Sequence, residues 1–347
     1  LDPESQLIFE FRSSDGRLNR IRDRFGNLLD VQYIANFDPP VFITDGKGRG
    51  LSLQYDENID LVGVTVASNT NSRTMTFTYE NGNLATATDA MGNVTRYNYA
   101  AGGTPGLIEN VQQPRGNTPV AWSFDAEGRV SAESYADGTS SSLFYASGTT
   151  PAQVILPDDS VKGLQHDEQG RLVSMTDAAG FTRTIGYSNE GINRITNRLG
   201  FETTFEYSPV HGELASFTNT GGGKTSYGYT QNVVNGFEFH DVTSVQYPDG
   251  TGKIVERAPS GLVTAVTGAS GNRWSFTHDA VGNVTSTAMP GGLTMEYEWD
   301  AQNRLRSVTD PSGNVTAMLY NGENQLAVVR HPGTEGLNRQ YRYDDAG

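Results

Sequence analysis

Three groups of residues in this chain have the types and spacing of ligand-binding or reactive sites. The stretch DENIDLVG places oxygen ligands at Asp56, Asn58 and Asp60, which is the spacing that opens a calcium-binding loop. Such a loop needs glycine at its sixth position and glutamate at its twelfth, where this chain has Leu61 and Ala67. We therefore expect no bound metal ion.

Two glycine-rich stretches have some features of nucleotide-binding loops. GGGKTS, from Gly221, has the lysine of a phosphate loop, but Thr218 stands where the first glycine is needed and no helix pattern follows. GKGRG, from Gly46, lacks the strand–helix–strand context of a dinucleotide site. We interpret both as turns and expect no cofactor.

The five histidines show no spacing typical of a metal-binding or catalytic site. They are His166, His211, His240, His278 and His331, and no His-Glu-x-x-His pair occurs. Two of them, His166 and His278, stand at positions where other parts of the chain carry an aromatic residue, which favours a packing role. A Ser–His–Asp triad needs its members to meet only in space, so one sequence does not exclude it, but nothing points to one. We predict a protein without catalytic residues.

Composition narrows the possible partners. The 347 residues carry a formal charge of −15, which disfavours nucleic acid and anionic lipid surfaces as partners. There is no cysteine, hence no disulfide or thiolate metal site. No apolar run approaches the roughly 20 residues of a membrane span.

The elements that would position such residues follow a repeat. Over most of the chain an aromatic residue or histidine recurs every 20 to 23 residues, most often every 21, and an acidic residue often follows it. We call these positions the markers. They are Tyr79, Tyr99, Phe124, Tyr145, His166, Tyr187, Tyr207, Tyr229, His278, Trp299, Tyr320 and Tyr343.

Glycines divide each unit into halves of about ten residues. Glycine tolerates the positive φ of tight turns, and the segments between the turns are rich in Val, Thr, Tyr, Phe and Ile, which favour strands. The positions taken as turn glycines include Gly82, Gly92, Gly170, Gly180 and Gly313. The pattern predicts an all-β fold of tandem β-hairpins of about 21 residues, which pair into one long antiparallel sheet.

Twist between strands, roughly 20–25° each, predicts that so long a sheet coils into a spiral or shell wall. Apolar and polar residues do not alternate strictly, which indicates either a wall one sheet thick or a register displaced by one residue. The marker rings are expected to stack along the sheet, with neighbouring rings about 4.5–7 Å apart.

We expect residues 1–347 to form a single repeat array that is a segment of a longer chain. Three stretches break the rhythm, at residues 36–74, 100–123 and 230–257. They are interpreted as insertions on loops, degenerate units or seams.

The repeated frame resembles the YD repeats of Rhs proteins. It is seen in HDEQGRLVSMTDAAGFTRTIGY and WDAQNRLRSVTDPSGNVTAMLY, and similar frames cover most of the chain. Such repeats also occur in teneurins and in the shell components of insecticidal toxin complexes. The resemblance implies a β-sheet spiral that closes into a hollow shell, and such shells hold a C-terminal toxin or serve in cell-surface adhesion. The family's DPxGRF-like self-cleavage stretch is not matched here, since TDPSGN at Thr309 is a repeat turn.

Three functions are compatible with the sequence. The leading hypothesis is a non-catalytic scaffold in a secreted or cell-surface protein, with the rest of the parent chain and an enclosed toxin domain as partners. The alternative is an extracellular adhesion module that binds surface glycans or another surface protein. An enzyme is the third, and only the unsupported triad speaks for it.

Overall fold

The computed structural model describes residues 2, 5–34, 39–67, 72–101, 106–145, 152–333 and 338–343. Within these ranges the chain forms strands and turns and no α-helix, so the predicted all-β fold is confirmed. The described residues contain no helix with the length and hydropathy of a membrane crossing.

The strands are short, and most have five or six residues. In chain order they are β1 (Ile8–Phe11), β2 (Leu18–Arg22), β3 (Leu28–Gln32), β4 (Phe42–Thr44), β5 (Gly50–Tyr55), β6 (Leu61–Ala67), β7 (Arg73–Glu80), β8 (Asn83–Thr88), β9 (Val94–Tyr99), β10 (Ile108–Gln112), β11 (Val120–Phe124), β12 (Val130–Tyr135), β13 (Ser140–Phe144), β14 (Gln153–Ile155), β15 (Val161–His166), β16 (Leu172–Thr176), β17 (Thr182–Tyr187), β18 (Ile192–Thr196), β19 (Glu202–Tyr207), β20 (Leu214–Thr218), β21 (Lys224–Val234), β22 (Phe237–Gln246), β23 (Gly252–Arg257), β24 (Val263–Thr267), β25 (Arg273–His278), β26 (Val284–Ala288), β27 (Thr294–Trp299), β28 (Leu305–Thr309), β29 (Val315–Tyr320), β30 (Leu326–Arg330) and β31 (Arg339–Gln340).

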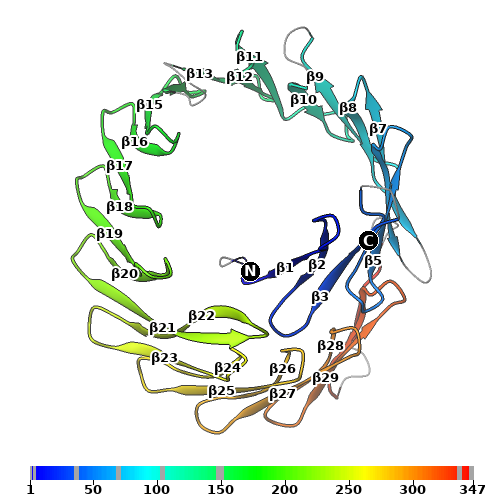
Figure 1. The fold of residues 1–347 in the computed structure, drawn as a ribbon, viewed down its shortest axis with the longest axis vertical. Helices are drawn as coiled ribbons and strands as arrows, with labels where there is room; N and C mark the ends of the chain where they lie inside the picture. The colour runs from blue at the N-terminus through cyan, green and yellow to red at the C-terminus, as the bar shows by residue number, and fades with distance from the viewer. Residues whose placement is uncertain are drawn as a thin grey trace.

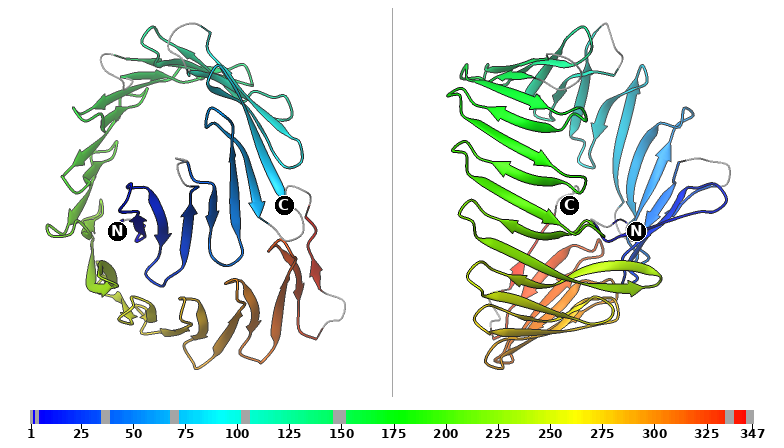
Figure 2. Two further views of the ribbon diagram at one scale, coloured as in Figure 1. Left: turned by 45° about the vertical axis from the view of Figure 1, so that its right-hand side comes forward. Right: turned by 60° about the vertical axis from the view of Figure 1, so that its left-hand side comes forward.

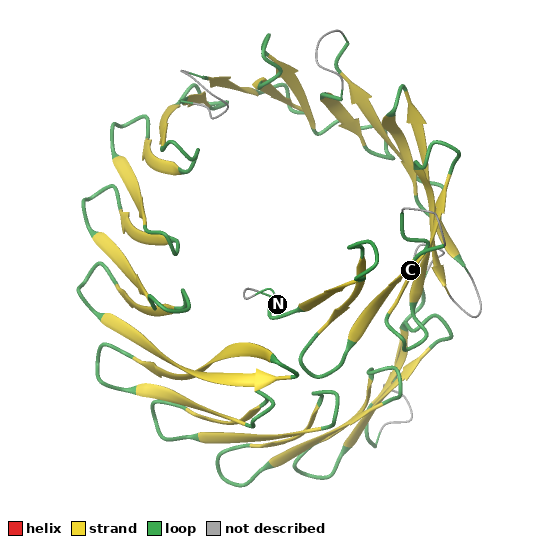
Figure 3. Cartoon of the chain, in the orientation of Figure 1, coloured by secondary structure: helices red, strands yellow, loops and turns green. Residues whose placement is uncertain are grey.

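Each strand pairs with its neighbours in the chain, and every pairing is antiparallel, as between β15, β16, β17 and β18. The result is one open sheet in which successive hairpins lie side by side (Figure 2). The sheet bends around a central region, and β1 to β3 lie inside the curve (Figures 1 and 3). The predicted single antiparallel sheet of tandem hairpins is confirmed.

Most turns have one design. An aspartate or asparagine at the first position accepts hydrogen bonds through Oδ1 from the backbone N–H groups two and four residues later, as Asp177 does from Ala179 and Phe181. The fourth residue takes positive φ, 81° at Gly180. Asparagine also tolerates this conformation, and Asn303 and Asn324 hold the same place with φ of 61° and 65°. A turn of a second kind joins β7 to β8. Asn81 and Gly82 both have positive φ there, as the two central residues of a type I′ turn require.

A β-bulge accompanies the markers. The pairing register shifts at Gln165/His166, at Gly186/Tyr187 and at Glu298/Trp299, each time as the marker strand ends. One extra residue turns the side chains that follow it to the other face. The bulge therefore explains why apolar and polar residues fail to alternate strictly along the sequence.

The wall has almost no enclosed core. The buried apolar side chains among the described residues are Ile8, Val31, Phe239 and Ala265. Large apolar side chains such as Phe201 and Leu199 are more than half exposed. Neighbour contacts and backbone pairing, rather than a central core, therefore hold the repeats together, as in other repeat proteins.

The stretches 36–74, 100–123 and 230–257 contain strands of this same sheet. Within the first, residues 36–38 and 68–71 lie outside the described ranges, as do residues 102–105 of the second. The third differs most from the repeat, because β21 and β22 have 11 and 10 residues and form the longest hairpin.

Candidate functional site at the seam of the curved sheet

The Asp that follows a marker shapes the turn and also binds the arginine four residues later. Oδ2 of Asp167 accepts a hydrogen bond from Nε of Arg171 at 2.7 Å, while Oδ1 accepts from the backbone N–H of Arg171. Partial burial opposes ionisation of Asp167, but these bonds outweigh it and lower the pKa of Asp167 below its usual value. The aspartate therefore stays ionised beside the guanidinium.

The same arginine lies against the next marker. The Arg171 guanidinium carbon is 4.3 Å from the ring centroid of Tyr187, and the Tyr187 hydroxyl donates to the carbonyl oxygen of Leu172 at 2.9 Å. Tyr187 ends β17 and Leu172 begins β16, so each such set fastens one hairpin to the one before it. Equivalent sets are Asp125, Arg129 and Tyr145, and Asp300, Arg304 and Tyr320.

Most other markers make the same hydrogen bond without the arginine. The acceptor is the carbonyl oxygen of the first or second residue of an earlier strand. The pairs are Tyr79 to Leu61, Tyr99 to Leu84, Tyr207 to Ile192, Tyr229 to Leu214, Trp299 to Val284 and Tyr343 to Leu326. The ring of Phe124 carries no hydrogen-bond donor. His166 and His278 stand at the ends of β15 and β25, each at a bulge. Arg257 takes a marker's place and donates to the carbonyl oxygen of Val242 at 3.0 Å.

The expected stacking of marker rings on one another is wrong. Markers recur on every second strand, so they lie two strand spacings apart, or about 9.6 Å. That distance exceeds the roughly 4.5–7 Å of ring–ring contacts. The guanidinium of Arg129, Arg171 or Arg304 fills the space beside the marker in the regular units.

The near-motifs prove to be repeat turns. Asp56 Oδ1 accepts from the backbone N–H groups of Asn58 and Asp60, so this carboxylate is committed to its own turn. In GGGKTS, Asn219 accepts from Gly221 and Gly223, and the strand β21 begins at Lys224 in place of a helix. In GKGRG, Asp45 accepts from the backbone of Lys47 and Arg49.

A buried ion pair joins the N-terminal hairpin to the distant β21–β22 hairpin. Nη1 of Arg24 lies 2.6 Å from Oδ2 of Asp241, and Nη2 lies 2.7 Å from Oδ1, although 217 positions separate the residues. The side chains of Arg24 and Asp241 are only 6% and 3% exposed. Asn232 donates to the same carboxylate at 2.8 Å, and the guanidinium carbon lies 4.3 Å from the ring centroid of the buried Phe239.

Burial alone would raise the pKa of Asp241, since it penalises the charged form. The hydrogen bonds from Arg24 and Asn232 outweigh that penalty, and the pKa of Asp241 falls below its ordinary value. The pair is therefore ionised at neutral pH and bidentate, which fixes the angle between the two hairpins.

The rest of this contact involves the turn between β2 and β3. Asn27 donates to the carbonyl oxygen of Val281 at 3.1 Å and accepts from Nδ2 of Asn303 at 3.1 Å. Gly261 lies so close to Arg24 that an added Cβ would be 1.8 Å from Nη1, so only glycine fits there. We call this contact region, from the Asp23–Asn27 turn to β22 and the turns at Gly261, Val281 and Asn303, the seam.

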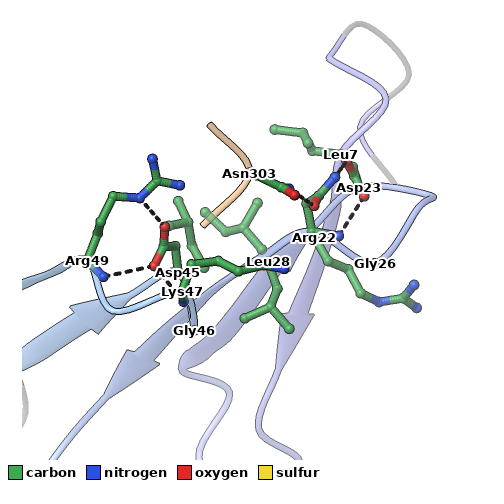
Figure 4. A pocket seen from close by; sticks show the side chains of 13 residues that line it. Leu7, Arg22, Asp23, Gly26, Leu28, Asp45, Gly46, Lys47, Arg49 and Asn303 are labelled. Carbon is green, nitrogen blue, oxygen red and sulfur yellow. Dashed lines mark hydrogen bonds and ion pairs between the residues drawn. The ribbon is translucent and has the colours of Figure 1, made fainter. Parts of the chain in front are cut away.

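A pocket of about 460 Å³ opens beside the seam (Figure 4). Leu7, Leu28 and Leu29 supply apolar lining, and Asp45 accepts hydrogen bonds from Arg49 along one side. Asn303 reaches into its edge from the other side of the seam (Figure 4).

A second cluster lies near the seam, and no sequence motif indicated it. His211 and Glu213 belong to the turn between β19 and β20, and His240 is on β22. His240 Nδ1 contacts Glu213 Oε1, and the rings of His211 and His240 meet edge to face with centroids 3.9 Å apart. The close pair in His-Gly-Glu, residues 211–213, is a weak signal, and the sequence gives no sign that His240 lies beside it.

Comparison with known proteins identifies the repeat type. The family model for the RHS repeat matches residues 259–294 and 299–335. A search of the curated proteins finds no match.

Among solved structures, likenesses are found to chains of toxin complexes. "Crystal Structure of TcdB2-TccC3 without hypervariable C-terminal region" has a TM-score of 0.46 and 14% identity, and the match covers 98% of this chain and 17% of that one. "Crystal Structure of TcdB2-TccC3-Cdc42" has a TM-score of 0.41 and 12% identity, with 98% and 17% covered. "Structure of Photorhabdus luminescens Tc holotoxin pore, Mutation TccC3-D651A" has a TM-score of 0.39 and 12% identity, with 94% and 21% covered. The chain therefore spans about a fifth of the length of these solved chains.

Strand pairing and turn geometry define the chain as a β-hairpin repeat protein. The repeats within residues 259–335 match the RHS type, also called YD repeats, as the sequence frame predicted. The family model matches the units from residue 259 to 335, and units elsewhere, such as those at Asp125 and Asp167, share the turn and the Asp–Arg–Tyr set of the matched unit at Asp300.

Proposed function

We propose that this chain is part of the wall of a shell-like scaffold built from RHS repeats. The observation that carries the proposal is the seam, where the sheet returns to its own first hairpin and forms a buried ion pair. A wall one sheet thick has little interior of its own to build a catalytic pocket, whereas a wall that bends back on itself can surround a volume.

The finer parts of this proposal concern the parent protein. Residues 1–347 form one array, including the stretches at 36–74, 100–123 and 230–257, and the array is a segment of a longer chain. That chain is secreted or at the cell surface, and its shell encloses or presents a C-terminal toxin or effector. The RHS repeats support this, because the resemblance to Rhs proteins implies a shell that holds a C-terminal toxin or serves in adhesion.

The markers and turn glycines are proposed to be structural positions without catalytic roles. Their support is the geometry of the regular units, in which hydroxyl, guanidinium and carboxylate bind one another or the backbone. Burial also raises the pKa of Tyr145 and of Tyr320, which keeps both hydroxyls protonated as donors.

Protease digestion of the full-length protein under native conditions tests enclosure. We expect a segment outside the repeat array to resist cleavage in the intact protein and to be cut rapidly once mild denaturant opens the wall. Equal cleavage of that segment before and after opening would contradict an enclosing role.

Exposed aromatic residues support the second candidate, an adhesion module that binds surface glycans or a surface protein. Phe181, Phe201 and Trp274 are 46%, 53% and 40% exposed, and such rings can stack on sugars. A glycan array probed with the purified chain is the test. Binding that Trp274→Ala abolishes would favour this function, and an array without signal would count against glycans.

A further inference from the structure

The long β21–β22 hairpin extends past the strands on its N-terminal side. The Tyr229 hydroxyl donates to the carbonyl oxygen of Leu214, where β20 begins, but β21 continues to Val234. His240 pairs with Gln231 on this extension. The extension therefore carries His240 to the turn between β19 and β20, which contains His211 and Glu213.

The side chains of β22 make different contacts on its two faces. Successive residues of a strand point to opposite faces. Phe239 and Asp241 contact Arg24 in the seam, whereas His240 and Glu238 face away from it toward the β19–β20 turn. His240 and Glu213 are partly buried and His211 is exposed, so an ion from solvent can reach the cluster.

The donor atoms suit a transition-metal ion. One ring nitrogen from each histidine and one carboxylate oxygen of Glu213 all lie within 4.8 Å of one another. Zinc binds imidazole nitrogen and carboxylate oxygen at roughly 2.0–2.2 Å, so ligand atoms in a tetrahedral site are about 3.3 Å apart. Small side-chain rotations bring the three donors to that spacing, and a water molecule can complete the tetrahedron. Calcium is a poor match, because it prefers a full shell of oxygen ligands.

Glu238 supplies the support that metal-binding histidines usually have. Its Oε1 lies 2.6 Å from Nε2 of His240, on the side of the ring opposite the Nδ1 that faces Glu213. A carboxylate at this position fixes the tautomer of the ring, so that Nε2 carries the hydrogen and Nδ1 keeps its lone pair for the metal.

We propose that His211, Glu213 and His240 bind one divalent transition-metal ion, for which zinc is the best fit. The ion fastens the β19–β20 turn to the hairpin that receives Arg24. A metal at this position stabilises the seam from the opposite face of β22, independently of whether the shell holds cargo.

Calorimetric titration of the untagged, EDTA-treated chain with zinc chloride tests the proposal. The expected result is one equivalent of zinc per chain and a rise in the unfolding temperature on zinc addition. His211→Ala, in the exposed turn, should weaken zinc binding more than 100-fold, beyond the roughly 10–100-fold expected of Glu238→Gln, which removes the supporting carboxylate. His331→Ala is the matched control and should bind zinc as the wild type does.

Cobalt substitution gives a second readout that does not depend on His240 variants folding. Co²⁺ in the proposed site should show the intense visible absorption of tetrahedral nitrogen–oxygen coordination, and His211→Ala should lose it. Zinc binding of equal affinity in wild type and His211→Ala, or no zinc binding by the folded wild type, would overturn the proposal.

Discussion

Between β15 and β20 the wall buries a single side chain, that of Ser216, whereas the seam encloses Arg24, Asp241 and Phe239 almost completely. The plain wall is held by many small, identical contacts, each between neighbouring hairpins. The seam is held by a few buried contacts between residues far apart in the chain. The curved shape thus depends on specific residues at the seam, while each stretch of wall tolerates local change.

The largest expected effect comes from breaking the seam ion pair. Asp241→Ala leaves Arg24 buried without its partner, which typically costs roughly 3–5 kcal/mol. Hydrogen exchange should show lost protection in β1 to β3 and in β21–β22, and little change in β15 to β20. Combining Arg24→Met with Asp241→Leu removes both charges and should recover much of the loss.

An exposed ion pair of the wall provides the matched control. Lys224 and Glu206 are 2.7 Å apart, but their side chains are 49% and 64% exposed. Such pairs contribute about 0–1 kcal/mol, so Glu206→Gln should change stability little. Equal losses in Glu206→Gln and Asp241→Ala would contradict the distinction between wall and seam.

Removing a marker ring should have a smaller and local effect. Tyr187 is partly buried, so Tyr187→Ala is expected to cost about 3 kcal/mol, the lower end for large aromatic truncations. Exchange should rise in β15 to β18 and remain unchanged at β28 and β29. Tyr187→Phe keeps the ring beside Arg171 and should cost about 1 kcal/mol, the usual contribution of one hydrogen bond. A loss spread evenly over the sheet would argue against neighbour-only coupling.

The turn glycines should give the smallest of the three effects. Gly180 has φ of 81° and open space around its Cα, so backbone strain is the only cost of a side chain there. Gly180→Val should cost roughly 1–3 kcal/mol in the free energy of unfolding, whereas Gly180→Asn should be nearly neutral, as Asn303 suggests. Thermal unfolding of the two variants side by side is the measurement, and equal melting temperatures would contradict the strain argument.

The repeated wall can be predicted from the sequence, whereas the seam cannot. Hairpins, turn glycines and the curved sheet follow from spacing and residue type, because each depends on residues within about twenty positions. Of the Asp–Arg–Tyr set, the repeat period indicates the aspartate and the marker but not the arginine between them.

What the sequence could not supply are contacts between residues far apart in the chain. Arg24 and Asp241 meet only because curvature accumulates over some twenty strands, and no local pattern encodes the sum. The expected stacking of marker rings is wrong for a related reason, since a 21-residue period spans two strands. His240 joins His211 only because the β21–β22 hairpin is long, and this length appeared in the sequence as a broken rhythm at 230–257.

Intramolecular cross-linking tests most directly whether the sheet returns to its own first hairpin. The chain has no cysteine, so Asn27→Cys and Val281→Cys can be introduced together and treated with a short bismaleimide. The seam contact between these residues predicts rapid cross-linking within the native chain and none in denaturant. The control pair is Asn27→Cys with Gln169→Cys. Gln169 holds the turn position in the plain wall that Val281 holds at the seam, and this pair should not cross-link. Absence of the Asn27–Val281 cross-link, or equal rates for both pairs, would contradict the closed seam.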